Sequence, residues 1–129
     1  ALVIPGGFGA AKNLSSYAFD GPKCKVHPDV AKAIKDMHAC GKPIGALCIA
    51  PVLVAKVLGK VSLTIGDDQA TADNLVAMGA THVPTSHGQI AIDRENKIVT
   101  TPCYMLNSRV DQVAEGADNL IRAMLEMMA

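Results

Sequence analysis

Short apolar runs alternate with longer amphipathic segments along this chain, and that alternation limits its fold more than any other feature. Runs with strand character are residues 1–4, 43–47, 61–66 and 89–101, the last of which holds two strands joined by a polar turn at 93–96. Helical periodicity occupies residues 27–41, 50–59, 68–79 and 107–128. Strands that alternate with helices predict an α/β layer fold, with a mainly parallel sheet covered on both faces.

The last amphipathic segment predicts a long helix with one buried face. Asn107 or Ser108 is the expected N-cap, because either side chain can accept a hydrogen bond from a free backbone N–H group. The predicted apolar face consists of Val110, Val113, Ala117, Leu120, Ile121, Met124 and Met128. By contrast, residues 8–26 show no clear period and contain glycine and proline, which favours a loop with room for a helical turn.

Length and charge exclude several classes of function. The 129 residues suffice for one domain with a buried core, which we expect to span residues 1–129. Lys and Arg number 12, as do Asp and Glu, and the chain has two Tyr, two Phe and no Trp. Neither a basic surface nor a base-stacking platform for nucleic acid is therefore expected. No apolar run approaches the ~20 residues of a membrane helix, so a small molecule or a protein is the expected partner.

The cysteines suggest reduced thiols rather than a disulfide framework. They stand at Cys24, Cys40, Cys48 and Cys103, in a chain with enough aliphatic residues to build a core without disulfides. Cys24 and His27 give the only spacing typical of metal ligands. Because no second pair accompanies them, we expect no metal site. The segment GGFGAAKN matches neither a P-loop nor a dinucleotide fingerprint, and no cofactor is expected.

Cys48 occupies the junction between an apolar strand and a predicted helix, in the sequence GALCIAPVL. A strand that runs into a helix through one residue directs that side chain into the crevice above the sheet, as in nucleophile elbows. Such a turn needs small neighbours, which Gly45, Ala46 and Ala50 supply. The alternative is that Cys48 is a small buried hydrophobe.

Backbone N–H groups near Cys48 suggest an oxyanion hole. The unpaired N–H groups at the start of the following helix favour a thiolate, and the N–H of Ile49 is directed at an oxygen held beside the sulfur. Gly6 and Gly7 follow the first strand, and their lack of side chains allows the backbone to approach closely and to supply a second donor. The alternative is an ordinary glycine turn. Both turns follow strand ends and face the same crevice.

The available bases are histidines and aspartates in loops. His82 and His87 follow a predicted helix and can reach the crevice, although ordinary loop positions explain both. We interpret His38 as solvated and His27 as a neighbour of a helix cap. Asp67 and Asp68 also follow a strand end, where they would either contact the site or cap the next helix.

The segments PGGFGAAKNLS, GKPIGALCIAP, LTIGDD and NKIVTTPCYM together resemble the ElbB-type glyoxalase-like family, within the PfpI and class I glutamine amidotransferase-like superfamily. The resemblance covers essentially the whole chain. It implies a flavodoxin-like three-layer sandwich, a reactive cysteine at Cys48 in a nucleophile elbow, and a pocket lined by Gly6 and Gly7. It also implies that residues 1–129 are the C-terminal portion of a longer domain, whose missing part supplies an acidic partner for Cys48.

The same resemblance implies a weak glyoxalase activity, in which a thiolate converts glyoxal to a hydroxy acid without glutathione or metal. His82 is the candidate in this chain for assisting the proton transfer. The loop at 66–68 lacks the histidine that amidotransferases carry there, which argues against glutamine hydrolysis. A protein in which Cys48 only senses oxidation is the other alternative. The resemblance further suggests a homodimer, located in the cytoplasm or, alternatively, in the mitochondrial matrix.

Overall fold

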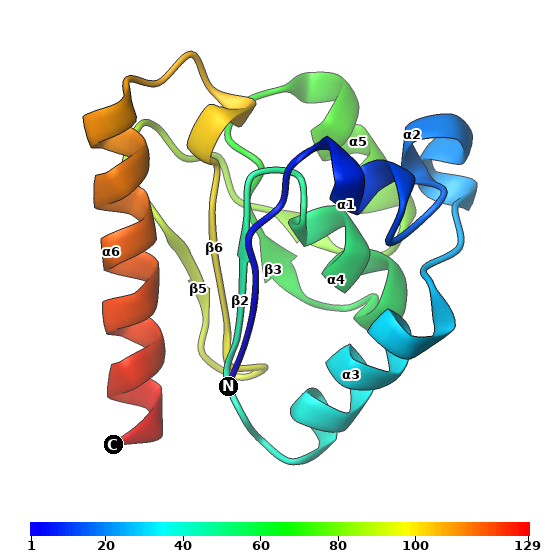
Figure 1. Ribbon diagram of the computed structural model, residues 1–129, viewed down its shortest axis with the longest axis horizontal. Coiled ribbons are helices and arrows are strands. Elements are labelled where there is room, and N and C mark those ends of the chain that lie inside the picture. Colours follow the sequence, from blue (N-terminus) through cyan, green and yellow to red (C-terminus); the bar gives the residue numbers. More distant parts are fainter.

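The computed structural model describes residues 1–129 and contains a four-stranded sheet flanked by helices (Figure 1). Its strands are β1 (Leu2–Ile4), β2 (Ile44–Leu47), β5 (Ala91–Asp93) and β6 (Ile98–Thr101). They lie in the order β1-β2-β6-β5, with the first three parallel and β5 antiparallel to β6. A second, two-stranded parallel sheet pairs β3 (Ser62–Leu63) with β4 (Thr81–His82). These features confirm the predicted α/β class with a mainly parallel sheet.

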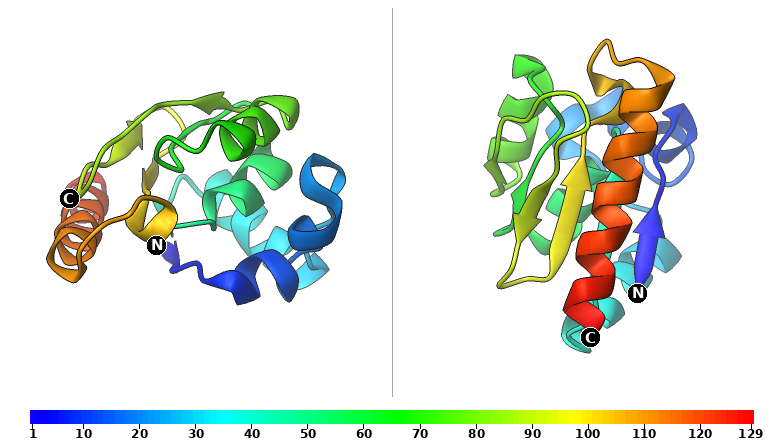
Figure 2. Two further views of the ribbon diagram at one scale, coloured as in Figure 1. Left: turned by 90° about the horizontal axis from the view of Figure 1, so that it is seen from above. Right: turned by 90° about the vertical axis from the view of Figure 1, so that its left-hand side faces the viewer.

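Helices cover both faces of the four-stranded sheet (Figure 2). On one side lie α3 (Pro28–Ala39) and α4 (Pro51–Leu58), and α5 (Gln69–Ala77) packs against α4. On the other side α6 (Val110–Met128) lies alone along β2 and β6. The three layers are those expected of a flavodoxin-like sandwich. No helix combines the length and the apolar character that crossing a bilayer would require.

Two apolar clusters hold the layers together. The larger has 17 buried residues, among them Ile34 of α3, Ile44 of β2 and Leu53 of α4, each with no exposed surface. The smaller lies under α6 and contains Val99, Leu120, Ala123 and Met124. Fully burying one such aliphatic side chain stabilises a fold by roughly 1.5–3 kcal/mol, so these clusters account for the sandwich arrangement.

The helix α6 differs from its prediction at its start and in its buried face. Its N-cap is Arg109, whose N–H donates to Gln112 Oε1 over 2.9 Å, whereas neither Asn107 nor Ser108 caps it. Leu120 and Met124 are buried as predicted, but Val110, Ile121 and Met128 are exposed. The face in contact with the sheet is turned toward Gly116 and Ala123, because Gly116 lets the helix approach Thr101 closely.

The segment 8–26 contains more helix than its sequence predicts. It forms α1 (Phe8–Lys12), α2 (Tyr17–Asp20) and the 3₁₀ turn η1 (Gly21–Lys23). The buried hydroxyl of Ser15 donates to the carbonyl oxygens of Ala10 and Ala11, and Ser15 also forms an isolated antiparallel bridge with Val26. These contacts stabilise short helices that have no amphipathic pattern. A second 3₁₀ turn that the sequence pattern did not indicate, η2 (Cys103–Met105), follows β6.

Candidate active site at the strand-to-helix turn

Cys48 has a left-handed backbone conformation at the turn that joins β2 to α4. Its φ angle is +61°, a value that residues other than glycine rarely adopt. The turn is closed by the N–H of Ala50, which donates to the carbonyl oxygen of Leu47 over 3.0 Å, and the N–H of Cys48 donates to Thr101 on β6 over 3.0 Å. Such a constrained residue between a strand and a helix has the geometry of a nucleophile elbow.

The turn after β1 packs directly against this elbow. Gly6 has a φ angle of +91°, and a Cβ atom added there would lie 2.5 Å from the carbonyl oxygen of Leu47 and 2.9 Å from Cys48 Cβ. Gly7 has a φ angle of +83° but no atom within 4 Å of the corresponding position. Glycine is therefore required at position 6 for two reasons: the positive φ angle, and the close approach to Leu47 and Cys48, which leaves no room for a side chain.

A largely apolar cavity of about 350 Å³ opens beside Cys48. The cavity is lined by residues from the turn after β1, the elbow, α1, α2 and η2. These residues are Gly7, Phe8, Ala11, Tyr17, Ala18, Cys48, Ile49 and Met105. Cys48 is half-buried, so its thiol is accessible from the cavity. The structure thus brings together three of the predicted site residues, Gly7, Cys48 and Ile49, and Gly6 packs immediately behind them.

Several backbone N–H groups around the cavity have no carbonyl partner. Those of Gly6, Gly7 and Ile49 donate to no backbone oxygen. Gly7 and Ile49 line the cavity together with the thiol. An unpaired N–H group is a strong donor for a partly negative oxygen, and the oxyanion hole at Gly6, Gly7 and Ile49 stays a prediction.

Tyr17 is a cavity residue that sequence reasoning missed. Its hydroxyl oxygen on α2 accepts a hydrogen bond of 2.8 Å from Asn74 Nδ2 on α5. This interaction fixes the ring at the cavity wall and leaves the phenolic hydrogen free to donate. Phe8 and Met105 were also missed, because each comes from a short helical turn whose position depends on tertiary packing.

A second thiol lies next to the elbow. Cys103 follows the carboxyl end of β6, is 9% exposed and has a φ angle of +47°. Burial raises the pKa of the Cys103 thiol, and the nearby charge of Cys48 raises it further. The backbone of Cys48 opposes both effects and lowers the pKa. The N–H of Cys48 donates to Thr101, two residues before Cys103, so the two cysteines lie near each other although 54 other residues separate them in sequence.

His82 lies outside the lining of the cavity. It is half-buried on β4, and its Nε2 accepts a hydrogen bond from the N–H of Ile65 over 3.4 Å. Burial lowers the pKa of His82, and a hydrogen bond with the backbone of Gly66 partly opposes this effect. Its predicted role in proton transfer stays a prediction.

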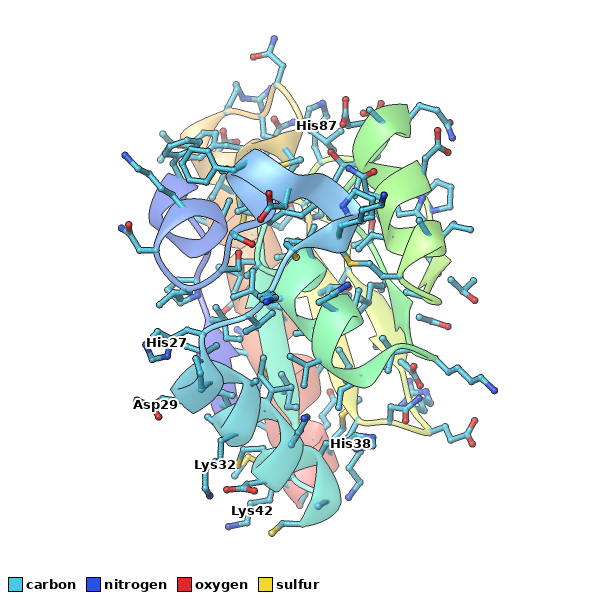
Figure 3. All side chains as sticks on the ribbon, turned by 90° about the vertical axis from the view of Figure 1, so that its right-hand side faces the viewer. His27, Asp29, Lys32, His38, Lys42 and His87 are labelled. Carbon is cyan, nitrogen blue, oxygen red and sulfur yellow. The ribbon has the colours of Figure 1, made fainter.

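The other histidines have structural contacts (Figure 3). His27 is the N-cap of α3, where its Nδ1 accepts from the N–H of Asp29 over 3.2 Å. His38 was expected to be solvated, but it is half-buried and its Nε2 lies 3.0 Å from Asn96 Oδ1. His87, at the opposite end of the molecule from His38, is paired with the hydroxyl of Ser108.

The aspartates of the loop at 66–68 do not line the cavity either. Asp68 caps α5, since its carboxylate accepts from the N–H of Thr71 over 3.0 Å, whereas Asp67 is exposed. Capping is thus the role of Asp68, the simpler of the two predicted alternatives. No group of three or more His, Cys, Asp or Glu side chains is placed to hold a metal ion.

Comparisons with known proteins agree with this fold. No family model matches the chain. It is 43% identical over 136 residues to human glutamine amidotransferase-like class 1 domain-containing protein 3, mitochondrial, and 40% identical over the same length to the rat ES1 protein homolog, mitochondrial. Each match covers 98% of the chain and 51% of the relative. The chain therefore spans about half the length of these curated relatives.

Solved structures give the same result. An isoprenoid biosynthesis protein with an amidotransferase-like domain from Ehrlichia chaffeensis has a TM-score of 0.85 and 33% identity, covering 97% of this chain and 58% of that one. The Rapid Encystment Protein 24 KDa of Francisella tularensis has a TM-score of 0.65 at 18% identity, covering 98% and 58%, and supports the fold alone. The chain thus has an amidotransferase-like fold and is similar in sequence to the glutamine amidotransferase-like class 1 and ES1 proteins.

Proposed function

We propose that this chain carries the reactive cysteine of a glyoxalase-like enzyme that acts on small dicarbonyls such as glyoxal, without glutathione or metal. The observation that carries the proposal is the position of Cys48. Its thiol is held on a left-handed turn at the wall of a cavity, beside the unpaired N–H groups of Gly7 and Ile49. This arrangement favours attack by sulfur on a carbonyl carbon, because the developing oxyanion has donors within the same wall.

The proposed reaction begins with a bond between the Cys48 sulfur and one aldehyde carbon of glyoxal. The carbonyl electron pair moves to oxygen, which the N–H groups stabilise, and protonation gives a hemithioacetal. Transfer of the C–H hydrogen, as a proton, to the neighbouring carbon of the adduct then produces a thioester of a hydroxy acid. Water cleaves the thioester, releases glycolic acid and restores the thiol, so the net change is the addition of one water to glyoxal.

The chemistry of the cavity supports a small uncharged substrate. None of its lining residues carries a charged side chain, and most are apolar. Glutamine would bring an ammonium and a carboxylate group into this surface without a partner for either, which is energetically costly. Nor does a histidine line the cavity to serve as the base of an amidotransferase triad. Glutamine hydrolysis is therefore the weaker alternative, and ammonia release from glutamine would support it.

The test is conversion of glyoxal to glycolate by the purified protein, compared with two matched cysteine variants. Cys48→Ala should reduce turnover to the rate without protein, because it removes the nucleophile. Cys40→Ala should retain the parental rate, since Cys40 is exposed at the end of α3. Equal rates for Cys48→Ala and the parent would refute the proposal. His82→Gln measures the predicted assisting role, which requires a lower kcat than that of His87→Gln.

A non-catalytic oxidation sensor is the second candidate, and the accessible thiol of Cys48 supports it as well. Selective oxidation of Cys48 by mild peroxide, without turnover of any dicarbonyl, would favour the sensor. For the location, the mitochondrial names of the human and rat relatives support the matrix alternative and give no support to the cytoplasm. A homodimer remains part of the proposal, and light scattering of the purified protein measures it.

A further inference from the structure

We propose that Cys103 is the resolving thiol of Cys48, so that a hydroperoxide converts the two residues into a reversible disulfide. The inference rests on the reactive Cys48 thiol of the proposed function, but it does not depend on turnover of dicarbonyls. It assigns a role to a buried cysteine that the proposed reaction leaves unused.

The fold brings the two cysteines together at the ends of neighbouring strands. Leu47 on β2 lies directly across from Thr101 on β6, and adjacent strands are about 4.8 Å apart. Cys48 follows Leu47 immediately, and the positive φ angle of Cys103 turns the chain just after Pro102. Disulfides need Cα atoms about 4.4–6.8 Å apart, and the two cysteines follow strand ends whose paired residues lie about 4.8 Å apart. The N–H of Cys48 donates to the carbonyl oxygen of Thr101 over 3.0 Å, so the elbow is still bonded to β6 two residues before Cys103.

The difference in exposure between Cys48 and Cys103 indicates which thiol reacts with the hydroperoxide and which one forms the disulfide afterwards. Cys48 lines the open cavity, where a hydroperoxide can reach it, whereas Cys103 is 9% exposed and does not line that cavity. Burial also keeps Cys103 protonated, because it raises the pKa of that thiol. Cys48 is therefore the residue that reacts first, and Cys103 is the residue that reacts with the product. The remaining thiols lie elsewhere: Cys24 is buried beside Lys56, and Cys40 ends α3.

The chemistry proceeds in two balanced steps. The Cys48 thiolate attacks one oxygen of the hydroperoxide, so that an S–O bond forms, the O–O bond breaks, and the second oxygen leaves as water or an alcohol after protonation. Cys103 then attacks the sulfur of the Cys48 sulfenic acid. The S–S bond forms, the S–O bond breaks, and the departing hydroxide takes up the thiol proton as water. In total the two thiols lose two electrons and the hydroperoxide gains them.

Intact-mass spectrometry after treatment with hydrogen peroxide tests this inference. Because Lys42 precedes Pro43, trypsin leaves Cys40 and Cys48 in one peptide, so the experiment uses a Cys40→Ser background. We expect a loss of about 2 Da, reversed by dithiothreitol, and a peptide spanning residues 36–56 linked to residues 98–109. With Cys103→Ser added, Cys48 should instead gain about 16 Da, trapped by dimedone, and then about 32 Da. Cys103→Ala serves as a second variant with the same expected masses.

Two outcomes would overturn the inference. One is a stable sulfenic acid on Cys48 while Cys103 is present. The other is a loss of about 2 Da that persists in Cys103→Ser. Glyoxal turnover is measured on the same reduced samples, so that the two proposals are separated. Disulfide formation without turnover refutes the enzymatic proposal alone, whereas turnover with a persistent sulfenic acid refutes the resolving role alone.

Discussion

Gly6 lies so close to Cys48 that no side chain fits between them. A Cβ atom on Gly6 would lie 2.9 Å from Cys48 Cβ and 2.5 Å from the carbonyl oxygen of Leu47. Carbon atoms in contact prefer separations of about 3.5–4.0 Å. The turn after β1 therefore forms the support against which the elbow after β2 is held, and the position of the thiol depends on two strand ends.

Gly6→Ala is expected to displace the elbow and to destabilise the protein. The added methyl group overlaps two atoms of the Leu47–Cys48 turn, and alanine is strained at a φ angle of +91°. Backbone strain of this kind costs about 1–3 kcal/mol, and overpacking costs a similar amount. Urea unfolding measures the loss of stability, and the rate of alkylation by iodoacetamide measures access to the Cys48 thiol.

The matched control is Gly7→Ala. Gly7 has a φ angle of +83°, but nothing lies within 4 Å of an added Cβ atom. Its cost should be that of backbone strain alone, about 1–3 kcal/mol. Equal losses of stability in Gly6→Ala and Gly7→Ala would show that the contact with Cys48 contributes nothing.

Gly45→Ala tests the packing of α6 on β2. A Cβ atom at Gly45 would lie 2.5 Å from Met124 Sδ and 2.8 Å from Leu120 Cδ2. We expect a loss of about 1–3 kcal/mol in the free energy of unfolding, since the side chains must move to accommodate the methyl group. In a Met124→Ala background the same substitution should cost less, which a double-mutant cycle measures. An undiminished cost there would contradict the assigned contact.

Much of the fold follows from local sequence patterns. The buried strand at 43–47 and the helix at 27–41 have a clear period and clear boundaries, and both form where expected. The helices within 8–26 have no such period, since they depend on the Ser15 hydroxyl and its partners. The small size of Gly45 was attributed to the turn, yet the structure attributes it to α6, an element far away in sequence.

The turn residues of the candidate site were predictable from the sequence, whereas the side chains that line its cavity were not. Strand ends and small residues indicated Cys48, Gly6 and Gly7, because those signals are local. Tyr17 reaches the cavity only because Asn74 holds it, and no local pattern links positions that far apart. For the same reason nothing in the sequence indicated that the turn after β6, which carries Cys103, lies next to Cys48.

Tyr17→Phe is expected to destabilise the protein modestly while keeping the cavity wall. It removes the hydroxyl that accepts the 2.8 Å hydrogen bond from Asn74 Nδ2 but retains the ring. A single neutral hydrogen bond contributes about 1 kcal/mol. A double-mutant cycle with Asn74→Ala should give a coupling energy of about that size, and additive losses would show that the hydrogen bond contributes nothing.

Asp93 links β3 to the β5–β6 hairpin, and its substitution should affect stability only above acidic pH. Burial acts to raise the pKa of Asp93, but hydrogen bonds from Ser62, Asn96 and Glu95 outweigh it and lower the pKa. The folded state thus binds the proton less tightly than the unfolded state does. The resulting stability is complete above the ordinary value of about 3.9 and is lost as the pH falls through the folded-state pKa.

Asp93→Asn should therefore lower the free energy of unfolding at pH 7 by about 1.5–3 kcal/mol, the contribution of a charged hydrogen bond. The difference from the parent should begin to shrink as the pH falls below about 4, where Asp93 binds a proton in the unfolded chain, and should be lost below the lower folded-state pKa. Urea unfolding at pH 7 and in acidic solution below about pH 4 measures it. Asp67→Asn, at an exposed carboxylate, is the control and should show no loss at pH 7. A loss for Asp93→Asn that is independent of pH would contradict this assignment.

His82 should make the protein less stable in mildly acidic solution. Burial lowers the pKa of His82, so its protonated form is favoured in the unfolded chain relative to the fold. The stability is complete above the unfolded-state pKa of about 6.5 and decreases as the pH falls toward the lower pKa of the folded state. His82→Gln removes the titrating group while keeping an acceptor for the N–H of Ile65, so its stability should change less between pH 7.5 and about 5.5. His87→Gln, at an exposed position, is the control, and its free energy of unfolding should vary with pH as that of the parent does. If His87→Gln instead removed the variation with pH, the effect would not belong to His82.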